Sequence, residues 1–130
     1  MTDPVIFWFN GGPGCSSLLG WAQEHGPYVL NDNTTEFVKN EFSWNKEATV
    51  IYLESPAGVG FSICKEERCS FDDDSSADDN LIALLNIMTM KFPELQKNKL
   101  WLSGESYAGI YVPYLALRIH NYTEHAHKTN

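Results

Sequence analysis

The clearest pattern in the chain is a set of three short apolar runs, each followed by turn-forming residues. Residues 5–9 (Val-Ile-Phe-Trp-Phe) stop at Asn-Gly-Gly-Pro-Gly, residues 49–53 (Thr-Val-Ile-Tyr-Leu) are followed by Ser-Pro-Ala-Gly, and residues 100–102 (Leu-Trp-Leu) stop at Ser-Gly. Continuous runs of this kind, rich in β-branched and aromatic residues, are typical of strands that are covered on both faces. The pattern predicts three central strands of one sheet.

Two helical patterns lie between and after these runs. An acidic segment, residues 72–79, precedes apolar residues at helical spacing, namely Leu81, Leu84, Leu85, Met88 and Phe92. Acidic residues favour the start of a helix, and Pro93 is expected to end this one. Residues 110–119 predict a second helix, with Pro113 tolerated near its first turn. Alternating strands and helices predict a single α/β domain, with a mainly parallel central sheet and flanking helices.

Charge and hydropathy exclude two classes of partner. The formal net charge is −8 at pH 7, and the nine Lys and Arg residues are scattered singly, so no basic stripe can neutralise phosphates. The longest apolar stretch, residues 81–90, is interrupted by Asn86 and Thr89 and is too short to cross a bilayer. We expect neither nucleic acid nor a membrane span. No cofactor or metal is expected, and the oligomeric state cannot be deduced.

The third apolar run leads into Gly-Glu-Ser-Tyr-Ala-Gly, residues 104–109. A strand, a sharp turn and a helix form a nucleophile elbow, in which a serine is held in a strained conformation. Residues two positions before and after that serine must be small to avoid collisions, and Gly104 and Ala108 meet this need. Ser106 is therefore the candidate nucleophile, although so short a motif also arises by chance.

A serine nucleophile needs donors for the negative charge that forms on the carbonyl oxygen, commonly two backbone N–H groups. Tyr107, directly after the serine, can supply one. The other is expected from a glycine-rich loop after a neighbouring strand, and residues 10–14 have that character. An ordinary turn explains either motif alone. Both motifs together, each after a strand of one α/β pattern, favour a serine hydrolase.

Three longer segments carry a resemblance to a known family. They are residues 7–17 (Phe-Trp-Phe-Asn-Gly-Gly-Pro-Gly-Cys-Ser-Ser), 54–62 (Glu-Ser-Pro-Ala-Gly-Val-Gly-Phe-Ser) and 104–109. Their sequences and order resemble the serine carboxypeptidases of lysosomes and vacuoles, over essentially the whole chain. The resemblance implies an α/β-hydrolase fold, here partial and truncated at both ends over residues 1–130. It also implies removal of C-terminal residues from peptides or proteins.

The resemblance assigns the acyl-transfer roles as well. Ser106 would be the nucleophile that forms the acyl-enzyme, and the N–H groups of Gly12 and Tyr107 would form the oxyanion hole. These roles require the Ser106 hydroxyl to lie at a strained strand-to-helix corner that faces the amides of the glycine loop. An elbow far from that loop would exclude the assignment.

Substrate binding is implied for four further residues. Asn10, the N–H of Gly11, and Glu105 would hold the terminal carboxylate of the substrate, with Glu24 as the partner of Glu105. A glutamate that faces a carboxylate is repulsive unless one of them carries a proton. Two close carboxyl groups that share a proton resolve this, because the protonated one can donate to the substrate. Peptidase activity is therefore expected to be favoured at acidic pH.

A catalytic serine also needs a histidine base and an acid, and in α/β-hydrolases both follow the nucleophile in the chain. The histidines are His25, His120, His125 and His127. We expect His120 on or just after the helix that follows Ser106, and the next two in a polar tail. All four are interpreted as solvated or structural. Since no aspartate follows the serine either, we expect a fragment without the triad Asp and His, inactive alone.

The cysteines and sequons bear on the compartment. In a reducing compartment all three cysteines would be thiols, whereas in an oxidising one Cys64 and Cys69 could close a short disulfide loop. The resemblance implies that Cys15 pairs with a cysteine beyond the given residues. Sequons at Asn33 and Asn121 are compatible with a glycoprotein. We expect a secreted, lysosomal or vacuolar protein, although the sequence opens without a signal peptide.

Two alternatives stay open. Acyltransferases that resemble this family pass the acyl group to an alcohol, but they usually carry Gly-Asp-Ser-Tyr at the elbow, whereas this chain has Glu105. A non-catalytic homologue, truncated or retained for binding, would explain the missing aspartate and histidine. A downstream in-frame continuation that contains both residues would favour the enzyme.

Overall fold

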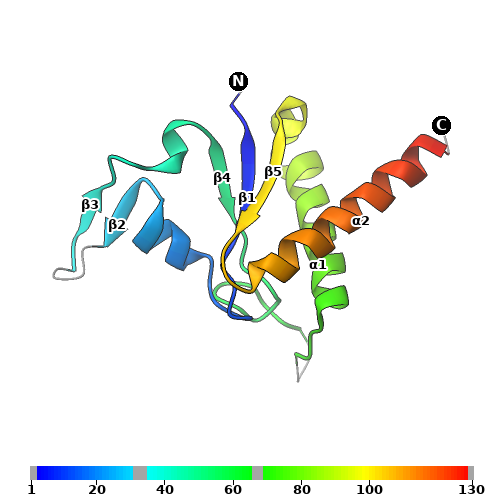
Figure 1. Cartoon of the computed structure of the whole chain (residues 1–130), viewed down its shortest axis with the longest axis horizontal. Coiled ribbons are helices and arrows are strands. Elements are labelled where there is room, and N and C mark those ends of the chain that lie inside the picture. The colour runs from blue at the N-terminus through cyan, green and yellow to red at the C-terminus, as the bar shows by residue number, and fades with distance from the viewer. Residues whose placement is uncertain (1–2, 31–34, 66–68, 129–130) are drawn as a thin grey trace.

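A parallel three-stranded sheet lies at the centre of the molecule. The computed structural model describes residues 3–30, 35–65 and 69–128. The strands follow the order β4, β1, β5 (Figure 1), with bounds Val5–Phe9 for β1, Thr49–Tyr52 for β4 and Leu100–Gly104 for β5. Val5 pairs with Thr49 on one side and with Leu100 on the other. The three predicted strands are confirmed, and β1 has its predicted bounds.

The three strands differ in how deeply they are buried. Among the described residues only β1 has a neighbour on both sides, and β4 and β5 form the edges. Burial follows this order, since β1 is almost wholly buried, β4 is half-buried, and Trp101 in β5 is 59% exposed. The predicted parallel sheet of three strands is thus present, and the central position of β4 and β5 in the complete sheet stays a prediction.

Helix α1, Asp73–Asn86, connects β4 to β5. A capping box starts it: Asp72 accepts the Ser75 N–H at 2.7 Å, and the Ser75 hydroxyl accepts the Asp72 N–H at 3.1 Å. A π-helical turn, Ile87–Lys91, extends the helix, and a 3₁₀ helix, Pro93–Lys97, follows. The predicted acidic start and the stop before proline are confirmed.

Helix α2, Ala108–Lys128, is longer than the predicted segment 110–119. Pro113 lies inside it, and the residues after 119 include no glycine or proline that would end it. His125 and His127 therefore belong to its last turns, and their placement in a polar tail was wrong. No helix of the described residues combines the length and the apolar character that crossing a membrane requires.

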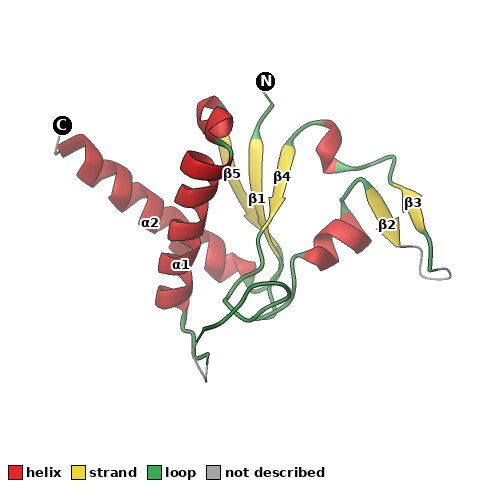
Figure 2. Cartoon of the chain, turned by 180° about the vertical axis from the view of Figure 1, so that it is seen from behind, coloured by secondary structure: helices red, strands yellow, loops and turns green. Residues whose placement is uncertain are grey.

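The core lies between β1 and the two long helices. Alternate β1 residues point to the same face, and Val5, Phe7 and Phe9 are fully buried there. They pack with residues of α1, its π-helical extension and α2, among them Leu84, Met88, Tyr111 and Leu115. Figure 2 shows both helices together on this side. Burial of side chains this large is worth roughly 1.5–3 kcal/mol each.

The connection from β1 to β4 lies on the other side of the sheet (Figure 1). It contains a π-helical turn, a two-stranded antiparallel hairpin and a 3₁₀ turn, with bounds Gly20–Glu24, Tyr28–Leu30 (β2), Phe37–Lys39 (β3) and Trp44–Lys46. Its side chains Trp44 and His25 pack against Trp8, which points away from the helices. The hairpin was not predicted from the sequence.

Candidate active site

The turn between β5 and α2 has the geometry of a nucleophile elbow. Ser106 lies in this turn with φ of 55°, and it is the one non-glycine residue at positive φ among those described. That conformation costs roughly 1–2 kcal/mol for an L-residue. A Cβ built on Gly104 would lie 2.5 Å from the Ala108 Cβ and from the Phe9 carbonyl oxygen, so this position admits only glycine. The Ser106 side chain is exposed at the corner.

The glycine loop that follows β1 lies directly against this elbow. A Cβ built on Gly11 would collide with the backbone nitrogen of Tyr107. It would also lie 2.7 Å from the Glu105 carbonyl oxygen and 3.1 Å from the Ser106 Cβ. The two segments meet because β1 and β5 are parallel neighbours, so their carboxyl ends open at the same edge of the sheet. The proximity required by the sequence analysis is present.

The two amides of the predicted oxyanion hole are available for a ligand. Gly12 has φ of 110°, and a Cβ there would lie 2.8 Å from the backbone nitrogen of Cys15, so glycine is needed. Within the described residues, neither the Gly12 N–H nor the Tyr107 N–H donates a hydrogen bond. The arrangement is compatible with the predicted oxyanion hole, and the catalytic role of both amides stays a prediction.

Asn10 joins the two glutamates that were expected to bind the substrate carboxylate. Its Nδ2 donates to Glu24 Oε1 at 3.3 Å and to Glu105 Oε1 at 2.9 Å. The orientation of the amide is fixed, because its Oδ1 accepts the Trp8 Nε1–H at 2.7 Å and the Gly20 N–H at 3.1 Å. Asn10 is 2% exposed, whereas both glutamates are exposed. Residues from three separate segments thus form one carboxylate cluster beside the elbow.

The rings of Trp8, Trp44 and Tyr52 form an aromatic cage around His25, next to the carboxylate cluster in sequence. The His25 ring stacks on Trp44 with centroids 4.2 Å apart and meets the edge of Trp8, also at 4.2 Å. Its Nδ1 lies 3.0 Å from the Tyr52 hydroxyl. His25 directly follows Glu24, so the cage fixes the end of the turn that presents this glutamate. The interpretation of His25 as structural agrees with its burial.

The negative charges of the carboxylate cluster affect the pKa values of two residues in this cage. Burial lowers the pKa of His25, and the negative charge of Glu105 partly opposes that shift. Burial also raises the pKa of Tyr52 to about 12, and the charge of Glu24 adds to this. The ring of His25 is therefore neutral and the Tyr52 hydroxyl protonated at neutral pH. The cage does not offset the charge of the carboxylate cluster.

Glu54 holds the loops in place, and sequence reasoning missed it. Its Oε1 accepts the Ser16 hydroxyl and the Ser17 N–H, both at 2.7 Å, and its Oε2 accepts the Phe61 N–H at 3.1 Å. The Ser17 hydroxyl in turn accepts the Asn10 N–H at 3.1 Å. The carboxylate therefore ties the segment after the glycine loop to the loop after β4. An acid placed directly after a buried apolar run was the only signal available.

The remaining histidines lie away from the elbow. His120, His125 and His127 are exposed on α2, which runs away from Ser106 (Figure 1). At 1.5 Å per residue, His120 lies about 18 Å along the axis from the start of the helix. The exposure of these three histidines agrees with their interpretation as solvated residues.

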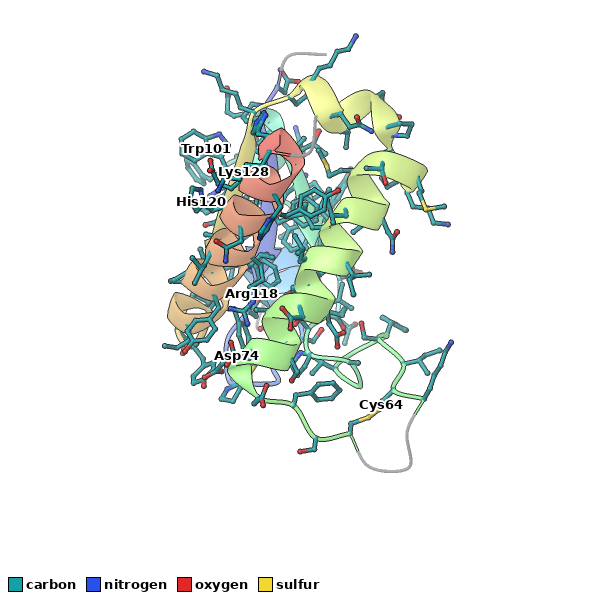
Figure 3. The ribbon with its side chains drawn as sticks, turned by 90° about the vertical axis from the view of Figure 1, so that its right-hand side faces the viewer. Cys64, Asp74, Trp101, Arg118, His120 and Lys128 are labelled. Carbon is teal, nitrogen blue, oxygen red and sulfur yellow. A yellow bond between two sulfur atoms is a disulfide. The ribbon has the colours of Figure 1, made fainter. Side chains whose placement is uncertain are left out.

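Of the two alternatives for Cys64 and Cys69, free thiols or a disulfide, the structure contains the disulfide. Cys64 and Cys69 form a disulfide in the segment between β4 and α1 (Figure 3), whereas Cys15 is an exposed free thiol in the glycine loop. The predicted pairing of Cys15 with a residue beyond this sequence stays a prediction. Of the two sequons, Asn121 is exposed on α2, and Asn33 lies outside the described residues.

Comparisons with known proteins agree with this geometry. The model of the family described as serine carboxypeptidase matches residues 1–130. Serine carboxypeptidase ctsa-4.1 of Caenorhabditis elegans is 48% identical over 119 residues, which cover 92% of this chain and 25% of that protein. Lysosomal protective protein of Mus musculus is 47% identical over 117 residues, with 90% of this chain and 24% of that protein covered.

A plant relative is similar to the same degree. Serine carboxypeptidase-like 35 of Arabidopsis thaliana is 49% identical over 116 residues, which cover 87% of this chain and 24% of that protein. The chain thus spans about a quarter of the length of these relatives. The family match over residues 1–130 includes the segments that form the elbow and the glycine loop.

Proposed function

The chain belongs to the serine carboxypeptidase family, and we propose that it supplies the nucleophile, the oxyanion hole and the carboxylate-binding residues of a serine-type carboxypeptidase. The full-length enzyme would remove C-terminal residues from peptides or proteins. The observation that carries this proposal is the contact between the glycine loop and the strained turn at Ser106. Residues 1–130 would then form one partial α/β-hydrolase domain.

In the proposed reaction, Ser106 Oγ attacks the carbonyl carbon of the last peptide bond. The N–H groups of Gly12 and Tyr107 would donate hydrogen bonds to the carbonyl oxygen as negative charge develops on it. The serine proton would pass, through a base outside residues 1–130, to the leaving amino group, the C–N bond would break, and the terminal amino acid would leave. Water then hydrolyses the ester on Ser106. Loss of one such donor typically lowers kcat about 10²- to 10³-fold.

Recognition of the terminal carboxylate would fall to the carboxylate cluster. Both protons of the Asn10 amide are already donated to Glu24 and Glu105. Asn10 can therefore contact the substrate only by exchanging one of these bonds. We infer that it mainly holds the two carboxyl groups together, while the N–H of Gly11 and a protonated glutamate bind the substrate.

This arrangement gives the activity an acidic preference. Two carboxyl groups on one amide, with a substrate carboxylate beside them, repel one another unless a proton is shared. Repulsion of this kind weakens substrate binding, and we propose that acidic buffer relieves it. KM is expected to rise from acidic to neutral pH.

The base and its acid would come from residues outside positions 1–130, because three of the histidines lie on α2 and His25 is held in the aromatic cage by Trp44 and Tyr52. Residues 1–130 alone are then expected to have no peptidase activity. Acyl transfer to an alcohol is the alternative chemistry for the same serine. Glu105 favours the peptidase, because the Asn10 amide holds it in one cluster with Glu24, the pair that the resemblance assigns to the terminal carboxylate of a peptide.

We further infer a secreted, lysosomal or vacuolar location. The disulfide between Cys64 and Cys69 supports it, because such bonds persist in oxidising compartments. One relative carries the name lysosomal protective protein. Immunostaining of the tagged full-length product against lysosomal and cytosolic markers tests this inference.

The decisive experiment is a peptidase assay on the full-length product. A dipeptide with a blocked N-terminus should lose its C-terminal residue in acidic buffer, and Ser106→Ala should abolish this. Ser70→Ala, a change of the same kind at an exposed serine away from the elbow, should have no effect. Transfer from an activated ester to an alcohol without peptide cleavage would favour the acyltransferase. Equal activity of Ser106→Ala and the unmodified enzyme would refute the assignment.

A further inference from the structure

The carboxylate of Glu54 contacts two loops that follow neighbouring strands of the sheet. The glycine loop follows β1, and residues 55–62 form the loop after β4 (Figure 2). Glu54 Oε1 accepts the Ser17 N–H at 2.7 Å, and Glu54 Oε2 accepts the Phe61 N–H at 3.1 Å. No Lys or Arg among the described residues pairs with this carboxylate. Its hydrogen bonds therefore connect the two loops.

Ser17 links this carboxylate to the start of the glycine loop. The Ser17 hydroxyl accepts the Asn10 N–H at 3.1 Å and donates to the Leu53 carbonyl at 2.6 Å. Asn10 and Ser17 are therefore fixed to each other and to the end of β4. Gly12, whose N–H is the proposed oxyanion donor, lies between these two fixed residues in the chain.

The loop after β4 is shaped around the same carboxylate. A Cβ built on Gly60 would collide with Glu54 Oε2, so the carboxylate occupies the space that any larger residue would need. The Ser62 hydroxyl donates to the Glu54 carbonyl at 2.6 Å, and the Gly58 N–H donates to the Ser62 carbonyl at 3.0 Å. Both the backbone and the side chain of Glu54 are thus bound to this loop.

The hydrogen bonds require an ionised acid at position 54. Each of the two carboxylate oxygens accepts a different backbone N–H, one from Ser17 and one from Phe61. A glutamine has the same shape, but one end of its amide is a donor and only the other end is an acceptor. In either orientation, Gln would place its NH₂ group against one of these N–H donors. Bonds to a carboxylate are also about twice as strong as bonds between neutral groups.

We propose that Glu54 is a positioning residue for the reaction at Ser106. It acts through Ser17 and Asn10, and it fixes the glycine loop so that the Gly12 N–H points at the carbonyl oxygen under attack. The loop lies directly against the elbow, where a Cβ built on Gly11 would be 3.1 Å from the Ser106 Cβ. A small displacement of the loop therefore misdirects the donor.

This inference rests on the proposed function, because the direction of the Gly12 N–H matters only when a carbonyl is attacked at Ser106. It extends that function by adding a residue after β4 to the residues on which the oxyanion hole depends. The interaction with the developing charge exists only in the transition state, so its loss should lower kcat more than it changes KM.

The first test measures kcat per reactive serine in the full-length enzyme. A fluorophosphonate that forms a bond between phosphorus and Ser106 Oγ, with release of fluoride, counts the reactive serines after complete labelling. Glu54→Gln should lower kcat per reactive serine about tenfold, which is less than the loss of an entire oxyanion donor would cost. A role in folding alone would lower the number of reactive serines and leave kcat per serine unchanged.

Gly60→Ala displaces the carboxylate without removing it, since the added Cβ collides with Glu54 Oε2. It should lower kcat per reactive serine in the same way as Glu54→Gln. In a protein that already carries Glu54→Ala, the Gly60→Ala change should have an effect below about twofold, because the side chain through which it acts is absent. Equal effects of Gly60→Ala in both backgrounds would contradict the proposal.

Two control variants separate position from charge and from stability. Glu41→Gln removes a carboxylate that accepts hydrogen bonds from Lys46 in the connection between β3 and β4. Leu84→Val removes apolar volume from the core, and urea unfolding measures the stability that it and Glu54→Gln lose. Both controls should keep the kcat per reactive serine of the unmodified enzyme. A tenfold fall in Leu84→Val would overturn the proposal, because lost stability alone would then explain the result.

The rate of labelling separates this inference from the proposed function, since the fluorophosphonate needs the serine and the oxyanion donors but no peptide. We expect the labelling rate to fall about tenfold in Glu54→Gln and in Gly60→Ala. If the full-length product cleaves no peptide but shows these falls at Ser106, the positioning role stands and the peptidase assignment fails. If it cleaves peptides and Glu54→Gln matches the unmodified enzyme in both kcat and labelling rate, the positioning role fails.

Discussion

Replacement of Asn10 tests how the carboxylate cluster is held. Its side chain is 2% exposed and makes four hydrogen bonds, to Trp8, Gly20, Glu24 and Glu105. Asn10→Ala removes the acceptor that pairs the Trp8 and Gly20 N–H groups, and the donor that joins the glutamates. We expect a loss of both stability and substrate binding from this single change.

The stability loss follows from the two buried donors. Each buried donor left unsatisfied costs about 1–3 kcal/mol, so the Trp8 and Gly20 N–H groups together predict a loss of about 2–6 kcal/mol. The glutamates are exposed and regain water, so they add little to this figure. Since a domain unfolds with about 5–15 kcal/mol in total, the effect is large enough to measure reliably.

Urea unfolding of the full-length product, followed by tryptophan fluorescence, provides the assay. Asn10→Asp is the matched variant, because it keeps an acceptor for both buried donors but adds a third carboxyl group facing Glu24 and Glu105. It should approach the stability of the unmodified protein in acidic buffer and lose stability as pH rises and the three carboxylates repel. An unfolding free energy of Asn10→Ala within about 1 kcal/mol of the unmodified protein would contradict the hydrogen-bond reasoning.

Three further changes test other parts of the structure. Gly104→Val should displace the elbow, because even a Cβ lies 2.5 Å from Ala108, and peptidase activity should fall about 100-fold with circular dichroism little changed. Burial lowers the pKa of His25 below 6.5, so the unfolded state binds more protons at this residue when the pH drops below 6.5. The free energy of unfolding should therefore fall over that pH range, and His25→Phe should weaken the pH dependence of the urea midpoint. Replacing Cys64 and Cys69 with serine should cost about 2 kcal/mol in thermal unfolding, and the mass gained on reduction should be larger for the unmodified protein than for the variant, by two hydrogen atoms.

The strands and helices could be predicted where neighbouring residues show a clear apolar or acidic pattern. The apolar run at residues 5–9 specified β1 to its last residue, and the acidic segment with Pro93 marked the ends of the helix that follows β4. The hairpin of β2 and β3 was not predicted, because each strand has only three residues and three residues cannot show an alternating pattern. The extent of α2 was underestimated, since its polar last turns lack the apolar periodicity that was used to predict it.

The same distinction holds in the candidate site. The small residues around Ser106 are required by the turn itself, so the motif could be predicted from the sequence. Glu54 acts through Ser16 and Ser17, which are distant in the sequence, and a pattern of neighbouring residues does not reveal such pairings. Asp73 was interpreted only as part of the acidic start of a helix. Its hydrogen bond from the Tyr107 hydroxyl follows from the packing of α1 against α2.

The register between β1 and β5 connects the core to the chemistry. Phe9 is paired with Gly104, and the Glu105 N–H donates to the Phe9 carbonyl at 3.2 Å, so Asn10 and Glu105 leave the sheet at the same level. Side chains alternate along a strand, so a slip of one residue would move Asn10 to the opposite face and separate it from both glutamates. The burial of Phe7 and Phe9 against the helices, opposite Trp8 in the aromatic cage, prevents that slip. The apolar pattern that predicted β1 is thus also what positions the glycine loop against Ser106.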